Sequence, residues 1–151
     1  MQPVLKPVIM LAPLTTPTNA DTATARLDTL GYDWVGIYLQ SGISDATTKP
    51  TTLKLSAGAT TTAASATDIT AFVGAGVGGF TIPVQDSTTP AVTAFEVDLR
   101  GRERYLFLTY APAAVQNTAV LAILSRAEKS PAATDDKTTE GEANILATVR
   151  G

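Results

Sequence analysis

Residues 94–110 read AFEVDLRGRERYLFLTY, and this stretch decides the fold class of the chain. Apolar side chains alternate with polar or small ones over residues 94–99, and a second alternation occupies residues 105–110. A period of two residues is that of a β-strand with one buried face and one wetter face. The link from Arg100 to Arg104 is short and contains one glycine, so we expect an antiparallel hairpin with a charged turn.

The composition limits the chemistry that this chain can perform. Its 151 residues include no cysteine and no histidine. Disulfides, thiolate or imidazole catalysis and nearly all transition-metal sites are therefore excluded. Fourteen acidic against eleven basic residues give a net charge of -3, which provides no field to attract nucleic acid. No apolar run reaches the roughly 18 residues of a membrane-spanning helix. We expect no cofactor, no metal, and neither nucleic acid nor a membrane as partner.

Short strands separated by Gly, Pro and Thr turns are expected along most of the chain. Besides the two in the quoted stretch, they occupy residues 21–30, 32–40, 51–57, 80–84 and 118–125. Residues 68–73 fit either a strand or one helical turn, and Pro83 interrupts residues 80–84, which places them at an edge. Seven to nine such strands are typical of a β-sandwich, and of a jelly roll in its eight-stranded form. The predicted fold is all-β, with about eight short antiparallel strands and extended N- and C-terminal arms.

Two of these strands are apolar on both faces. Residues 32–40, YDWVGIYLQ, are therefore predicted to be central in a sheet or to meet a partner with one face. Trp34 and Tyr38 share one face of this strand, and we favour ordinary packing for the pair over a binding platform. Residues 118–125, TAVLAILS, also suit a helix, but we interpret them as a strand because a lone helix would follow a hairpin.

Prolines concentrate at the N-terminus, where Pro3, Pro7, Pro13 and Pro17 lie within residues 1–20. Proline fixes φ and removes a backbone donor, so this segment is an extended arm or an edge strand and not a central strand. We predict an N-terminal arm over residues 1–20, which can touch a neighbouring molecule; a flexible terminus is the alternative and the more usual outcome for a chain end. The first three of these prolines are candidate partner-docking residues.

The C-terminal part of the chain is acidic and rich in Thr and Ala. We predict a β-sandwich domain over residues 21–130 and a tail over residues 131–151, which is flexible or docked on a partner. Residues 145–149, ILATV, are β-prone and suit addition to another sheet edge. The acidic residues between 135 and 142 match no standard calcium loop, so we interpret them as solvated.

One glycine-rich motif and one arginine cluster are the candidates for binding. Residues 74–79, GAGVGG, fit the GxGxxG pattern of a dinucleotide site. Such a site needs a helix after the motif, whereas a strand-like segment follows here. We therefore interpret the motif as a turning loop.

Arg100, Arg102 and Arg104 are candidate partner-docking residues, because guanidinium groups bind carboxylates and phosphates in a bidentate way. We favour a solvated corner instead, because acidic residues such as Glu103 lie within a few positions.

No catalytic set emerges from the sequence. Asp33, Asp98 and Glu103 could meet in space as the carboxylates of a glycoside hydrolase, but none lies in an aromatic context that suits a sugar. Serine nucleophiles would have no imidazole partner in this chain. We therefore expect no enzyme and assign no catalytic, cofactor-binding or metal-binding residues.

Four stretches resemble a known group of proteins. They are GYDWVGIYLQSG (31–42), TLKLSAG (52–58), FEVDLRGRERYLFL (95–108) and AVLAILSRAEKSP (119–131). Over roughly residues 22–131 the chain is similar to small head decoration, cement or head-fibre base proteins of tailed bacteriophages, which have a jelly roll or related β-sandwich. The corner DLRGRERYL and the ending AILSRAE are the most specific pieces. The chain departs from the group in residues 57–67, where relatives carry an acidic segment, and in its long acidic C-terminal extension.

The resemblance implies a structural virion protein that is made in the host cytoplasm and decorates the capsid exterior. Its implied partners are the major capsid protein and further copies of the chain, with a homotrimer favoured and a dimer as the alternative. A fibre-base or tail structural module of the same particle is an alternative. A second alternative is a carbohydrate-binding β-sandwich that uses Trp34, Tyr38 or Tyr110.

Overall fold

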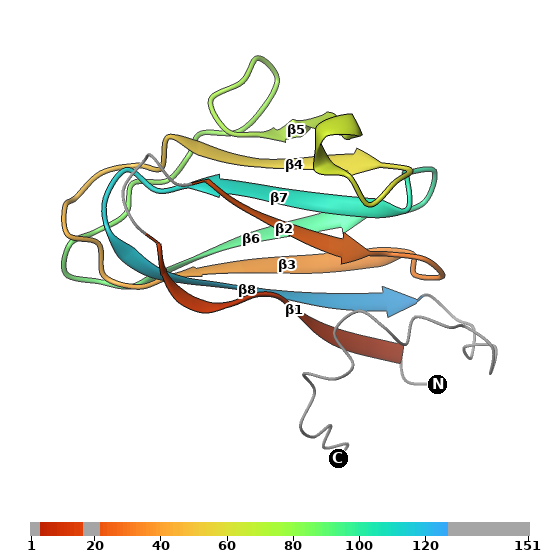
Figure 1. Ribbon diagram of the computed structural model, residues 1–151, viewed down its shortest axis with the longest axis horizontal. Helices are drawn as coiled ribbons and strands as arrows, with labels where there is room; N and C mark the ends of the chain where they lie inside the picture. Colours follow the sequence, from red (N-terminus) through yellow and green to blue (C-terminus); the bar gives the residue numbers. More distant parts are fainter. Residues whose placement is uncertain (1–3, 17–21, 127–151) are drawn as a thin grey trace.

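The computed structural model describes residues 4–16 and 22–126 as two antiparallel four-stranded sheets packed face to face (Figure 1). Sheet A has the strand order β1-β8-β3-β6, and sheet B has the order β2-β7-β4-β5. The elements are β1 Val4–Thr16, β2 Ala23–Asp28, β3 Trp34–Ser41, β4 Thr52–Gly58, a short 3₁₀ helix η1 Ala63–Ser65, β5 Thr67–Val73, β6 Ala91–Asp98, β7 Tyr105–Ala111 and β8 Gln116–Arg126. The predicted all-β sandwich is confirmed.

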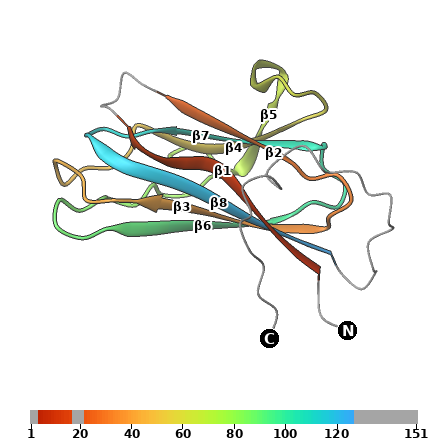
Figure 2. The same cartoon turned by 60° about the horizontal axis from the view of Figure 1, so that its bottom comes forward.

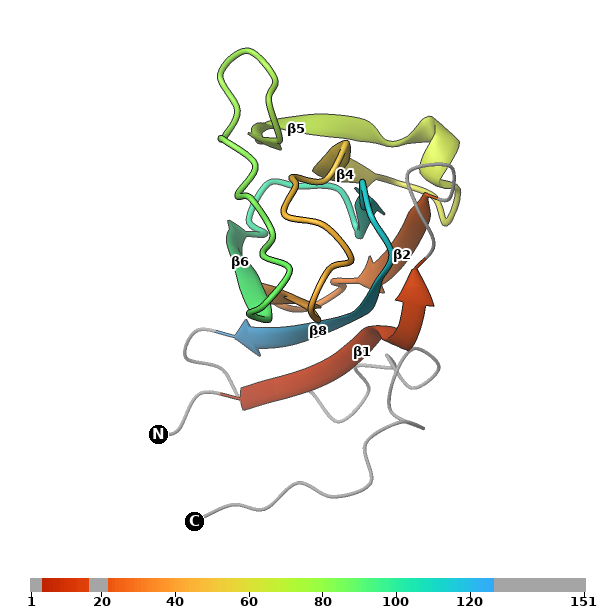
Figure 3. The same ribbon diagram turned by 90° about the vertical axis from the view of Figure 1, so that its left-hand side faces the viewer.

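The strands pair in a nested order. The innermost pair is β4 with β5, followed outward by β3 with β6, β2 with β7 and β1 with β8. These pairs fall alternately into the two sheets, so the chain crosses repeatedly from one layer to the other (Figure 3). The sandwich is therefore held by contacts between residues that are distant in the sequence.

The predicted hairpin over residues 94–110 is wrong. Both strands exist, as β6 and β7, but β6 pairs with β3 in sheet A while β7 lies between β2 and β4 in sheet B. The linker crosses between the layers, and its turn is closed by the Arg102 amide, which donates to the Leu99 carbonyl at 3.1 Å. The alternation gave each strand its inner face correctly, because Val97 and Leu106 are both fully buried.

The core lies between the two sheets and is built from every second residue of each central strand. In β3 the inward residues Val35, Ile37 and Leu39 are buried, and in β4 Leu53 and Leu55 are buried. The remaining large members of the cluster are Val8, Leu27, Ile69, Ile82, Phe95, Val97, Leu99, Leu106, Leu108, Tyr110, Val120 and Leu124. The period-two pattern in the sequence is the direct record of this arrangement.

Residues 4–16, which the sequence analysis assigned to an N-terminal arm with an edge strand as the alternative, form the edge strand β1 and belong to the sandwich. It pairs with β8, contributes Val8 to the core and bends toward β2 after two irregularities in register (Figure 2). An edge position tolerates Pro7, which lacks an amide proton. Pro3 and the predicted tail, residues 131–151, lie outside the described residues.

The segment between β5 and β6 does not contain the strand predicted for residues 80–84. Residues 67–73 form β5, and the chain then runs along the open side of the sandwich between β5 and β6 (Figure 3). This segment makes only isolated bridges, between Gly74 and Phe80 and between Thr48 and Gln85. Pro83 lacks the amide proton that a strand position would use for its ladder, and Ile82 is buried toward the core instead.

Candidate interaction surfaces

The outer face of sheet B is polar. Outward positions of β2 and β7 carry Thr24, Arg26 and Thr109, and the aromatic side chains at the other outward positions of β7 are half-buried at Tyr105 and buried at Phe107. Across β4 and β5, the Lys54 ammonium group forms a salt bridge of 2.9 Å with Asp68 in an exposed position. A strand face of this composition is stable against water without a partner.

The outer face of sheet A is apolar. Leu5, Ile9, Trp34 and Val92 remain 54%, 41%, 40% and 64% exposed on it. We call this surface the apolar face; it comprises Leu5, Pro7 and Ile9 of β1, Ala119, Leu121 and Ile123 of β8, Trp34, Gly36 and Tyr38 of β3, and Val92 and Ala94 of β6. The two faces of the sandwich thus differ in chemistry, and only sheet A presents a broad hydrophobic surface.

Trp34 and Tyr38 lie on this apolar face and not in the core, so the expectation of ordinary packing for the pair is wrong. A Cβ atom at Gly36 would lie only 2.9 Å from the Tyr38 hydroxyl and 3.1 Å from a carbon of its ring. The ring therefore lies along β3 over Gly36, where any larger residue would displace it. A hollow of about 410 Å³ lies between this strand, Leu5 and Ile123.

Two of the three predicted docking arginines are held by carboxylates of the chain itself. Arg100 donates from Nε and Nη2 to the two oxygens of Asp98, at 3.0 and 2.8 Å. Its guanidinium carbon lies 5.2 Å from the centroid of the Trp34 ring. Hydrogen bonds from the Arg100 side chain and amide lower the pKa of Asp98 to about 2. Arg104 forms the same bidentate pair with Asp28, at 2.9 and 2.5 Å.

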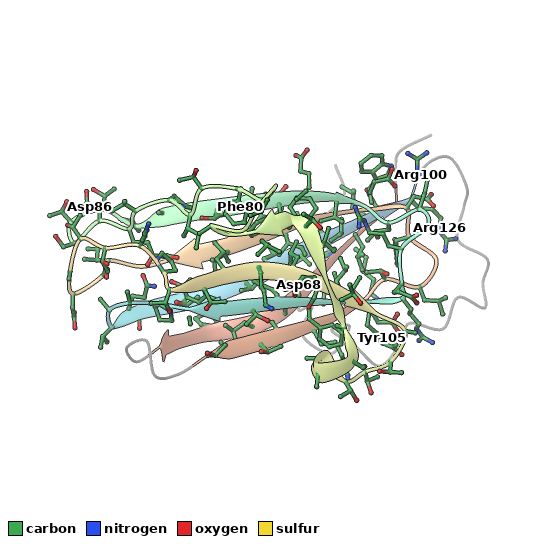
Figure 4. The ribbon with its side chains drawn as sticks, turned by 90° about the horizontal axis from the view of Figure 1, so that it is seen from above. Asp68, Phe80, Asp86, Arg100, Tyr105 and Arg126 are labelled. Atoms are coloured by element: carbon green, nitrogen blue, oxygen red, sulfur yellow. The ribbon has the colours of Figure 1, made fainter. Side chains whose placement is uncertain are left out.

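The three arginines do not project to one side. Arg102 turns back to donate 2.7 Å to the Asp98 carbonyl, and Arg104 lies 4.9 Å from the centroid of the Tyr105 ring, on the sheet B side. Figure 4 shows Arg100 and Tyr105 on different sides of the same end of the sandwich. Asp28 was missed as a partner because it lies 76 residues away from Arg104 in the sequence.

Of the predicted proline docking residues, two lie in the described part of the chain. Pro7 is half-buried opposite Ile123 in the β1–β8 ladder, and Pro13 is exposed. Pro13 lines a hollow of about 350 Å³ together with Gln40 and Val92, at the end of the β3–β6 ladder away from Trp34 and Asp98. Whether these prolines dock a partner stays a prediction.

A buried polar cluster near the end of the sandwich that lies away from Arg100 was not foreseen. Gln85 enters between the sheets and donates from Nε2 to the Tyr110 hydroxyl and to Ser41 Oγ, both at 2.9 Å. Gln116 donates to Gln85 Oε1 at 2.8 Å and also to the Tyr110 hydroxyl. Burial raises the pKa of Tyr110. Because Tyr110 is only 1% exposed, it is not available to stack on a sugar.

The glycine-rich motif forms a turning loop, as the sequence predicted. The loop leaves β5 with the Gly74 amide bonded to the Leu53 carbonyl and returns with the Ala75 amide bonded to the Phe80 carbonyl, both at 2.9 Å. No helix follows it. Val77 is fully exposed at its tip, which projects beyond β5 (Figure 1).

Residues 4–16 and 22–126 contain no group of three or more acidic side chains arranged to hold a metal ion. The same ranges contain no helix long and apolar enough to cross a membrane. Asp33 is engaged through its backbone, whose amide donates to the Ser125 carbonyl and whose carbonyl accepts from the Leu99 amide. The acidic residues between 135 and 142 lie outside the described residues.

Comparison of the chain with protein-family models, with curated protein sequences and with solved structures finds no match. The choice of a function therefore depends on the surfaces of the sandwich. Of these surfaces, the apolar face is the one whose exposure to water is unfavourable for a protein without a partner.

Proposed function

We propose that this chain is a structural virion protein, a decoration or cement protein on the outer surface of a phage head, and not an enzyme. The observation that carries the proposal is the one-sidedness of the sandwich. The outer face of sheet B is polar, whereas the apolar face of sheet A exposes large side chains such as Leu5 and Trp34. Exposed patches of this breadth mark sites of protein association.

We further propose that the sandwich is a jelly roll. The nested pairing of β4 with β5, β3 with β6, β2 with β7 and β1 with β8 supports this class. A jelly roll forms when one long antiparallel hairpin is rolled so that successive strand pairs fall alternately into two sheets. Folds of this kind expose two broad faces and two loop-bearing ends, which suits a protein with several neighbours.

The proposed partners are the major capsid protein and further copies of the chain, with a homotrimer as the favoured assembly and a dimer as the alternative. Attachment of many identical copies to a lattice gains strength from repetition, so each contact needs only modest affinity. Arg100, Arg102 and Arg104 at one end, and Pro13 on β1, remain the proposed contacts with the capsid, whereas Pro7 belongs to the apolar face.

The test is addition of the purified full chain to heads of a tailed phage that were assembled without it, followed by co-sedimentation and cryo-electron microscopy. A decoration protein is expected to saturate and to appear over the icosahedral faces. A fibre-base or tail module would appear at a single vertex or at the fibre attachment points. Absence of any binding to heads, by a folded protein, would contradict the proposal.

A carbohydrate-binding module is the second candidate, because Trp34, Tyr38 and the adjacent hollow lie together on one exposed face. Arg100 already covers part of the indole ring, which leaves less of it for a sugar. A glycan array probed with the full chain, and with Trp34→Ala as the matched control, separates the two functions. Binding that disappears in Trp34→Ala would favour the carbohydrate module.

A further inference from the structure

The apolar face has a regular construction across all four strands of sheet A. The register places Ile9 of β1, Leu121 of β8, Tyr38 of β3 and Ala94 of β6 in one row across the sheet. The neighbouring row contains Pro7, Ile123 and Gly36, followed by Glu96 at the β6 edge. The hydrophobic surface is therefore continuous from one edge of the sheet to the other.

Charge on this face is confined to one edge. Among the outward residues described in these four strands, the acidic side chains are Glu96 and Asp98, both on the edge strand β6. Asp98 is neutralised by its bidentate pair with Arg100. An apolar centre with polar groups at the rim is the usual anatomy of a protein–protein interface.

We propose that the apolar face is the contact between copies of this chain. This inference deepens the proposed function, on whose homo-oligomer it rests, by assigning the contact to particular strands. Because two copies that meet through the same face are related by a two-fold axis, the contact builds a dimer, which is the alternative to the favoured homotrimer. A second copy is the occupant that fits the charge distribution, because an uncharged surface has nothing to offer a strongly charged partner. Two such sheets pack at about 10 Å with interdigitating side chains.

The size of the face agrees with this assignment. Sheet A has four strands, and β3 is eight residues long; strand spacing of about 4.8 Å and a rise of about 3.3 Å give a flat area of about 500 Å². Side-chain relief enlarges the accessible area further, toward the roughly 600 Å² per partner of the smaller specific interfaces. The contact therefore needs the full width of the sheet, and a charge introduced anywhere across the row should weaken it.

The C-terminal segment of residues 145–149 is too small to be the occupant. Five residues in extended form cover a strip about 17 Å long and one strand wide, whereas the face is four strands wide. Most of the exposed area of Leu5, Ile9 and Val92 would remain in water beneath such a strip. A second sheet covers all of it.

Trp34 is the one tryptophan of the chain and lies on this face, so its fluorescence reports on the contact. The experiment measures the mass of the purified full chain by light scattering over a range of concentrations, together with Trp34 emission and acrylamide quenching. We expect a mass above that of the monomer. As the oligomer forms, we expect a shift of the emission to shorter wavelength and at least a twofold fall in quenching.

Two variants at opposite ends of one row locate the interface. Ile9→Lys and Ala94→Arg both change exposed positions, so the fold should persist, as checked by circular dichroism. Each should weaken self-association at least tenfold, because the new charge is buried without a partner. The matched control is Val77→Lys, an exposed β-branched residue on the loop that projects away from sheet A (Figure 1). It should leave the mass and the Trp34 signals unchanged.

A chain that stays monomeric at all concentrations would overturn the inference. So would an oligomer that both variants leave intact, because its interface would then lie elsewhere on the protein. If the protein is a monomer, the variant Leu146→Lys of the full chain tests the tail. A change in the acrylamide quenching of Trp34 in this variant would identify the tail as the occupant. Self-association that follows the expected pattern in a protein that does not bind phage heads would keep this inference and reject the decoration role.

Discussion

Removal of the Tyr110 hydroxyl tests the buried polar cluster. In Tyr110→Phe the ring stays in the core, and the two glutamine amides lose one acceptor. Each amide keeps another partner, because Gln85 Nε2 still donates to Ser41 Oγ at 2.9 Å and Gln116 Nε2 still donates to Gln85 Oε1 at 2.8 Å. A net hydrogen bond contributes about 0.5–1.5 kcal/mol, and a fully orphaned buried donor costs about 1–3 kcal/mol. We therefore expect a loss of about 1–2 kcal/mol in the free energy of unfolding at neutral pH.

The same substitution has a signature in pH. Burial raises the pKa of Tyr110 above its ordinary value of 10.0, so the folded state holds this proton at a pH where the unfolded state releases it. The protonated hydroxyl therefore contributes its full stabilisation below pH 10.0, the ordinary pKa. This contribution is lost as the pH rises from there through the higher pKa of the folded state. The stability gap between the wild type and Tyr110→Phe should therefore narrow above about pH 10.

The assay is urea unfolding of both proteins at pH 7 and at several values from 9 to 11, followed by circular dichroism. Tyr105→Phe is the matched control, since Tyr105 is a half-buried residue of the same strand outside the cluster. It should change the unfolding free energy by less than about 0.5 kcal/mol. A Tyr110→Phe protein as stable as the wild type at pH 7, or a gap that does not change with pH, would refute the reasoning.

Two further predictions concern the loop and the charged corner. In Gly79→Ala the new Cβ would lie 1.9 Å from the Val73 carbonyl oxygen. We therefore expect thermal unfolding to show a loss of about 2 kcal/mol or more in the free energy of unfolding, which is within the range of disruptive backbone changes. Val77→Ala at the exposed tip should have no measurable effect. The carboxyl of Asp98 should titrate near pH 2 by NMR and move back toward its ordinary value of 3.8 in Arg100→Ala, and an unchanged midpoint would contradict the assigned pair. Stabilisation from this pair is present above pH 3.8 and is lost as the pH falls toward 2.

The structure also shows where sequence reasoning could reach the binding surface and where it could not. The sequence predicted that residues 32–40 form a strand with two apolar faces. Such a strand is either central in a sheet or meets a partner with one of its faces. The alternation cannot tell which of the two faces is inside, because both carry large hydrophobic side chains. In the structure, Val35, Ile37 and Leu39 lie in the core, and Trp34 and Tyr38 lie on the outer face of the sheet.

Charged and polar partners were the least accessible from the sequence. Arg104 pairs with Asp28 and Gln85 bonds to Tyr110 across separations of 76 and 25 residues. Neither separation has a periodic signature, since each depends on which strands become neighbours. The absence of histidine and cysteine, in contrast, removed whole classes of chemistry before any fold was known.

The sequence by itself determined that the chain forms short strands and which side chains of most strands face inward, because the pleat fixes a period of two along every strand. Only the tertiary structure decided the partners of each strand. It placed β6 and β7 in opposite sheets instead of in one hairpin. The physical reason is that alternation specifies a buried face but not its neighbour, which is chosen by the packing of two complete sheets around a shared core.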